Sequence, residues 1–142
     1  MKKIKILFVL MSLIVVVAGC SSLHQKNDLD DIEVKPFTTV DDLGDSYGIY
    51  YGFAVENKRP NGTYLSVDVT PKDTELKKVI GNKVSTTDVA GASAEYIDSG
   101  NDTTLGITVA VPKEKFTKKE LEKKVKDFSF SISNGEIEKK YE

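Results

Sequence analysis

The sequence predicts a mainly β fold: an antiparallel β-sandwich with one short helix near residues 117–126. Several segments alternate bulky apolar residues with small or polar ones, which is the period of a half-buried strand. Gly, Pro and Asn residues that favour turns separate these segments at short intervals. The alternative is an α+β fold, in which the helix covers one face of an antiparallel sheet.

Residues 1–19 are expected to be a cleaved export signal rather than part of the domain. Three lysines within the first five residues precede an apolar run at 6–17 that only Ser12 interrupts. The twelve residues of this run would extend about 18 Å as a helix, which is short of the ~30 Å hydrocarbon core of a bilayer. A signal peptide therefore explains this run better than a permanent transmembrane helix.

Cys20 is the only cysteine, and it stands where such a signal would be cut. The tetrapeptide Val17-Ala18-Gly19-Cys20 resembles the lipobox of bacterial prolipoproteins. The resemblance implies cleavage between Gly19 and Cys20 and a diacylglyceryl group, with long acyl chains such as palmitate, on the Cys20 sulfur. Two such chains anchor a protein stably, whereas one binds marginally. The membrane is thus an implied partner, and the implied location is the extracytoplasmic side of the cell membrane.

The mature chain is expected to have two parts. Residues 20–34 are polar and lack a sustained apolar period, so they are expected to form a flexible tether. The only histidine, His24, lies there without the converging ligands that a metal site requires. Residues 35–142 are expected to form a single β-rich domain.

The charge of the mature chain argues against one class of partner. Removal of Lys2, Lys3 and Lys5 leaves 17 basic and 22 acidic side chains, a net charge of −5. An acidic protein repels nucleic acid, so no nucleic-acid partner is expected. Nineteen of the 20 basic residues are lysine, a bias that favours an AT-rich genome and a Gram-positive source.

The first strand patterns of the domain lie at residues 47–55 and 65–69, which both alternate with period two. The turn signal between them, at 58–62, predicts that they form a β-hairpin. The segment Phe53-Ala54-Val55-Glu56-Asn57 is similar to the early strands of Ig-like domains found in Gram-positive lipoproteins. The chain lacks the paired cysteines and the tryptophan of true Ig domains.

The middle of the domain has weaker patterns. Residues 76–80 are compatible with a short helix or a weak strand, and residues 84–90 and 92–97 with two further strands. A turn at 99–102 then leads to a strand at 103–111, in which alternation is strong again.

The last part of the chain has two clear local signals. Thr117 and Glu120 have the spacing of a capping box, which predicts that the helix begins there. Residues 128–132 alternate, and Asn134-Gly135 separates them from a final strand at 136–141. An Asn-Gly pair in this position predicts a two-residue type I′ hairpin turn.

The residues provide no catalytic constellation. Because the domain contains no histidine and Cys20 would be acylated, neither a Ser-His-Asp triad nor a thiol nucleophile is available. The aspartates at 28–31 and 41–45 lack the ligand spacing of an EF-hand. No Gly-rich phosphate loop precedes a helix. We therefore expect no enzymatic activity, no metal and no cofactor.

Two tyrosines are the candidate contacts for a partner. Tyr50 and Tyr64 each lie on the strand face opposite the bulky apolar residues, and tyrosine is enriched in binding hot spots. If the two strands are neighbours, Tyr50 and Tyr64 lie together on a wet surface. The alternative is that they pack beneath the other sheet or the helix.

These features favour a membrane-anchored, non-enzymatic interaction module for a protein or peptide, a layout that resembles exclusion and immunity proteins of mobile elements. A structural or accessory subunit of the cell envelope is the alternative. A third hypothesis concerns residues 13–19, which resemble the lipoprotein signal fragments released as mating pheromones. The sequence does not indicate an oligomeric state.

Overall fold

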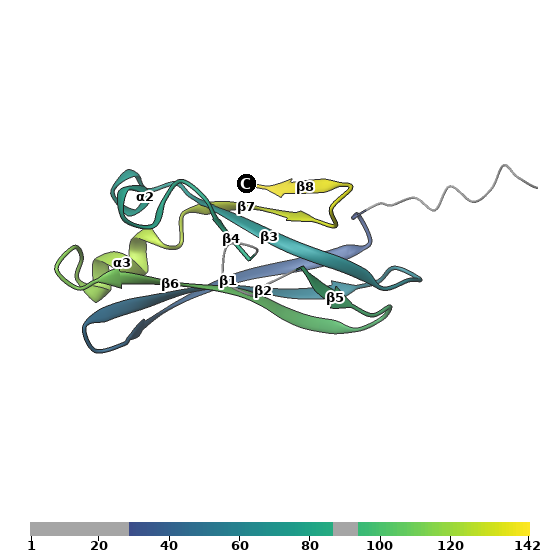
Figure 1. Ribbon diagram of the computed structural model, residues 1–142, viewed down its shortest axis with the longest axis horizontal. Coiled ribbons are helices and arrows are strands. Elements are labelled where there is room, and N and C mark those ends of the chain that lie inside the picture. Colours follow the sequence, from purple (N-terminus) through teal and green to yellow (C-terminus); the bar gives the residue numbers. More distant parts are fainter. Residues whose placement is uncertain (1–28, 87–93) are drawn as a thin grey trace, which may run out of the picture.

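The structure, a computed structural model, is a sandwich of two antiparallel β-sheets with two short helices at one end (Figure 1). It describes residues 29–86 and 94–142. The expected signal peptide, Cys20 and His24 lie outside the described residues. The elements in chain order are β1 (Ile32–Asp42), β2 (Ser46–Asn57), β3 (Thr63–Pro71), α2 (Thr74–Ile80), β4 (Val84–Ser85), β5 (Glu95–Ile97), β6 (Asp102–Pro112), α3 (Lys118–Lys124), β7 (Phe128–Ser133) and β8 (Glu138–Tyr141).

The strand order confirms the expected sandwich and follows the connectivity of the immunoglobulin fold. One sheet has the order β1-β2-β6, and the other has the order β4-β3-β7-β8, with β5 also paired to β3. In an immunoglobulin domain, strands A, B and E share one sheet and strands C, F and G the other. The strands β1, β2 and β6 occupy the first three of those positions, and β3, β7 and β8 the second three.

The expected hairpin between β2 and β3 is wrong. The neighbours of β2 are β1 and β6, whereas β3 pairs with β4, β5 and β7 in the other sheet. The turn at 58–62 therefore carries the chain from one sheet to the other. A turn signal shows that the chain reverses direction, but it does not show which sheet receives the next strand.

The sandwich begins upstream of residue 35, where the domain boundary was expected. Leu29 and Ile32 are almost fully buried in the core, and Ile32 pairs with Asn57 at the end of β2. Two residues of the expected tether are thus part of the hydrophobic core. The alternation in β1 is harder to recognise, because Pro36 and charged residues interrupt it at an exposed edge.

Aromatic side chains from both sheets meet in the core. The rings of Phe53 and Phe130 have centroids 4.9 Å apart, and the rings of Tyr51 and Phe128 have centroids 5.2 Å apart. The Tyr51 side chain is fully buried, and its hydroxyl has no hydrogen-bond partner among residues 29–86 and 94–142. Burial raises the pKa of this hydroxyl to about 12, because the charged form would lose its hydration.

The helix predicted near 117–126 is confirmed as α3. Thr117 is its N-cap and forms a reciprocal capping box with Glu120, as the spacing predicted. The expected helix or strand at 76–80 is a second helix, α2, which Asp73 caps. Both helices lie at the same end of the sandwich (Figure 1).

Strands were expected at 84–90 and 92–97, and the described residues of these ranges include two short strands. β4 is limited to Val84–Ser85 and β5 to Glu95–Ile97, and both pair with β3. Residues 87–93 lie outside the described part of the chain.

The C-terminal hairpin is confirmed, but its turn is longer than expected. Ser133 pairs with Glu138, so four residues form the loop instead of two. A type I′ turn needs positive φ at both central residues, and among the two Asn-Gly residues only Gly135 has it, at 89°. The Asn134 carboxamide oxygen instead accepts hydrogen bonds from the N–H groups of Glu136 and Ile137, which stabilises the longer loop.

Candidate functional site

Tyr50 and Tyr64 do not form a common site. Tyr50 lies on β2 beside Tyr51, which faces the core, and Tyr64 lies on β3 beside Leu65, which also faces the core. Since β2 and β3 belong to different sheets, the two tyrosines point outward from opposite faces of the sandwich. Each has a different aromatic neighbour.

The Tyr50 ring covers its own sheet and is partly buried. A Cβ atom on Gly106, in the neighbouring strand β6, would lie 2.2 Å from the Tyr50 hydroxyl, so the ring lies directly over this glycine. Phe37 lies over Gly52 in the same way, and the Phe37 and Tyr50 ring centroids are 5.8 Å apart. Tyr50 therefore fills a gap on the sheet surface.

Tyr64 is much more exposed, and its ring lies against that of a second exposed tyrosine. Its side chain retains 59% of its accessible surface, and that of Tyr96, on β5, retains 51%. Their ring centroids are 4.9 Å apart and the rings are inclined at 58°. A Cβ on Gly62 would lie 2.1 Å from the Tyr96 hydroxyl, so this glycine allows the Tyr96 ring to lie against the loop. The two adjacent exposed rings form an aromatic patch on the surface of the sandwich.

We name this surface the tyrosine platform. It is a shallow pocket of about 350 Å³, formed by the loop that joins β2 to β3, the start of β3, β5 and the loop that joins β7 to β8. Its lining residues are Arg59, Asn61, Gly62, Thr63, Tyr64, Tyr96, Asn134 and Glu136. Among the residues that the structure describes there, none is aliphatic, and the two tyrosine rings are the large apolar surfaces.

A buried amide holds the platform together. Asn57 is fully buried at the end of β2. Its carboxamide oxygen accepts a 3.0 Å hydrogen bond from the backbone N–H of Arg59. Its Nδ2 donates to the carbonyl oxygens of Asn61 (3.0 Å), Ile97 (3.0 Å) and Asp98 (3.2 Å). The loop that carries Arg59 and the strand that carries Tyr96 are thereby fixed to the same side chain.

Sequence reasoning found Tyr64 but missed Tyr96 and Asn57. Tyr96 lies in the short strand β5, within a segment whose alternation is poor. Asn57 has the appearance of an ordinary polar residue before a turn. The turn at 58–62 that follows Asn57 was the available signal. Backbone groups that leave a sheet at a turn need new hydrogen-bond partners, and an Asn side chain can supply them.

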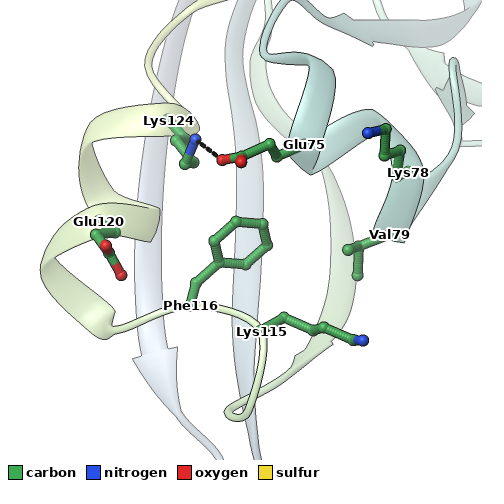
Figure 2. A pocket seen from close by; sticks show the side chains of 7 residues that line it. All are labelled: Glu75, Lys78, Val79, Lys115, Phe116, Glu120 and Lys124. Atoms are coloured by element: carbon green, nitrogen blue, oxygen red, sulfur yellow. Dashed lines mark hydrogen bonds and ion pairs between the residues drawn. The ribbon is translucent and has the colours of Figure 1, made fainter.

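A second concave surface lies between α2 and α3 (Figure 2). It is a groove of about 560 Å³ with Phe116 and Val79 among its lining residues. The Lys124 ammonium group joins the two helices through a 2.7 Å ion pair with Glu75 and a 2.9 Å ion pair with Asp73. It also lies 5.6 Å from the centroid of the Phe116 ring, within range of a cation–π interaction.

Four charged groups at or beside the groove, those of Asp73, Glu75, Glu120 and Lys124, are held by contacts within the protein. Hydrogen bonds from the Leu76 N–H and from Lys124 lower the pKa of Asp73. Hydrogen bonds to Glu75 and Asp73 raise the pKa of Lys124. Glu120 is held in the capping box by Thr117, which lowers its pKa. The ion pairs of Lys124 therefore connect α3 to the start of α2 across the groove.

Comparisons with known proteins do not assign a family. No protein-family model matches the chain. No curated protein matches it significantly either.

Two further properties concern residues 29–86 and 94–142 only. Within these ranges, no group of three or more His, Cys, Asp or Glu side chains is placed to hold a metal ion. None of the helices in these ranges has the length and apolar character needed to cross a membrane.

Proposed function

We propose that the chain is a lipid-anchored protein on the extracytoplasmic side of a bacterial membrane and that its β-sandwich is a non-enzymatic binding module. The observation that carries the binding role is the tyrosine platform, where Tyr64 and Tyr96 expose more than half of their surface next to each other. Exposed aromatic side chains on a rigid support are typical of recognition surfaces. The lipobox at 17–20 supports the anchoring role.

The position of the first described residues supports an orientation for this module. The described chain starts at Leu29, and β1 starts at Ile32, opposite the end of β2. The loop that carries Arg59 lies at that end, whereas α2 and α3 lie at the other (Figure 1). The eleven residues of β1 span about 35 Å between the two ends. The tyrosine platform therefore lies at the end nearer the proposed anchor.

The proposed anchoring is tested by lipid labelling. The wild-type chain, Cys20→Ala and the matched control Ser22→Ala are expressed in a Gram-positive host that is fed a labelled fatty acid. We expect label and membrane fractionation for the wild type and for Ser22→Ala. We expect no label and a longer, uncleaved chain for Cys20→Ala. Equal labelling of Cys20→Ala would refute the anchoring.

A further inference from the structure

The chemistry of the tyrosine platform points to the class of its ligand. We infer that the platform binds a saccharide, namely a glycan chain of the bacterial envelope. This inference rests on the proposed function, because the proposed location places the platform beside such glycans. Its structural basis is the pairing of two tyrosine rings with a lining that is otherwise polar.

The lining distinguishes a saccharide from a peptide side chain. Pockets that accept apolar ligands or anchor side chains are lined mainly by hydrophobic residues, whereas the described lining of this one, apart from the two tyrosines, is Arg, Asn, Gly, Thr and Glu. A pyranose ring has one face of C–H groups and a rim of hydroxyl groups. The C–H face would stack on a tyrosine ring while the rim hydroxyls meet the surrounding polar groups.

The polar side chains around the two tyrosine rings carry hydrogen-bond donors that a ligand could use. Arg59 lines the pocket, is partly exposed and has no ion pair among residues 29–86 and 94–142. A guanidinium group carries five N–H donors in a fixed plane. Asn134 uses its carboxamide oxygen inside its own loop, and its NH₂ group carries two further N–H donors. Hydroxyl and acetamido oxygens of a sugar are matching acceptors.

The platform is also preorganised. The Asn57 side chain fixes the Arg59 loop to β5, and the Ser99 hydroxyl donates a further 2.6 Å hydrogen bond to the Arg59 carbonyl oxygen. Groups that are held in place before binding lose less conformational entropy when a ligand arrives. The pocket volume of about 350 Å³ is at the small end of ligand sites, which run from about 300 to 1,000 Å³. It accommodates a short stretch of a glycan.

The test is calorimetric titration of the purified full chain in detergent with a β-1,4-linked tetramer of N-acetylglucosamine. We expect binding by the wild type and about tenfold weaker binding by Tyr64→Ala and by Tyr96→Ala. The matched control is Phe37→Ala, which removes an exposed aromatic ring that lies over a glycine on the opposite sheet. Its affinity is expected to equal that of the wild type.

Two outcomes overturn the inference: no binding of the tetramer by the wild type, or equal weakening by Phe37→Ala. Thermal unfolding of every variant separates loss of the site from loss of the fold. Because the titration uses purified protein, it does not depend on lipidation of Cys20. A failure of the anchoring proposal therefore leaves the binding result intact, and a failure of binding leaves the labelling result intact.

Discussion

The side-chain amide of Asn57 donates a 3.0 Å hydrogen bond to the carbonyl oxygen of Ile97, 40 residues further along the chain. Asn57 ends β2 in one sheet, and Ile97 ends β5 in the other. The backbone of Asn57 is also bonded: its N–H donates to the Asn101 carbonyl oxygen (2.9 Å), and its carbonyl oxygen accepts from the Gly100 N–H (2.8 Å). A single buried residue thus connects both sheets and the loop that bears Arg59.

Replacement of Asn57 by aspartate is expected to destabilise the fold strongly. The carboxylate cannot donate to the carbonyl groups of Asn61 and Ile97 and would instead repel them. We expect a loss of about 3 kcal/mol in the free energy of unfolding at pH 7, measured by urea denaturation. The matched control is Asn101→Asp, at an exposed side chain, with an expected change within about 0.5 kcal/mol. An equal effect of both variants would show that Asn57 has no special role.

Tyr51→Phe is expected to stabilise the protein. The Tyr51 hydroxyl is buried and has no hydrogen-bond partner in the described part of the chain, and a buried unsatisfied polar group costs free energy. Its removal should raise the free energy of unfolding at pH 7 by about 1 kcal/mol. Thermal or urea unfolding measures this change. A destabilised variant would indicate that the hydroxyl has a bonding partner in solution.

The same hydroxyl predicts an alkaline transition. Its pKa is about 12 in the folded state, above the value of 10.0 for a free tyrosine. The folded state therefore favours the neutral form, and its contribution is complete below pH 10 and is lost as the pH rises through 12. We expect a loss of about 2–3 kcal/mol over this range. Tyr51→Phe should lack this loss, whereas Tyr64→Phe, at an exposed ring, should retain it.

Asp73 is expected to have separable roles as a helix cap and as a charge partner. Asp73→Ala removes the oxygen that accepts from the N–H groups of Glu75 and Leu76, so it should cost about 1 kcal/mol of stability. Asp73→Asn keeps a capping oxygen and should cost less. The exposed Asp127→Asn is the control. If Asp73→Asn and Asp73→Ala cost the same in urea denaturation, the cap contributes nothing.

The lowered pKa of Asp73 makes its contribution to folding stability depend on pH. Because the folded pKa is below the unfolded value near 3.8, the contribution of Asp73 is present above that value and is lost as the pH falls through the folded pKa. Asp73→Asn should remove this part of the acid-dependent loss of stability. Urea denaturation between pH 2 and pH 7 measures it. An unchanged acid profile would contradict the assignment.

Gly62→Ala is expected to weaken ligand binding without unfolding the domain. Its new Cβ would lie 2.1 Å from the Tyr96 hydroxyl, so the exposed Tyr96 ring would have to move. We expect weaker binding of the N-acetylglucosamine tetramer and a nearly unchanged unfolding temperature. Gly106→Ala displaces Tyr50 in the same way on the other sheet and serves as the control. Unchanged binding by Gly62→Ala would show that the Tyr96 position is unimportant.

The elements that local signals specify were predictable from the sequence. Bulky and smaller residues alternate along most of β2 and β6, and the Thr117 and Glu120 pair marks the start of α3. These signals depend only on which face of a strand is buried and on which groups cap a helix. Such properties reside in consecutive residues.

The pairing of distant segments was not predictable in this way. The sheet that β3 joins depends on competition between partners up to 70 residues away, and no local pattern encodes that competition. Tyr64 was found because it lies in a clear strand, but its true neighbour is Tyr96 rather than Tyr50. Asn57 was missed because two of the four partners of its side chain, Ile97 and Asp98, come beside it only in the folded chain.

Mass spectrometry of the wild-type protein purified from a Gram-positive host tests the central claim most directly. Lipid anchoring predicts an N-terminal fragment that begins at Cys20 and carries a diacylglyceryl group on its sulfur. The contradicting result is an unmodified Cys20 within a chain that still carries residues 1–19.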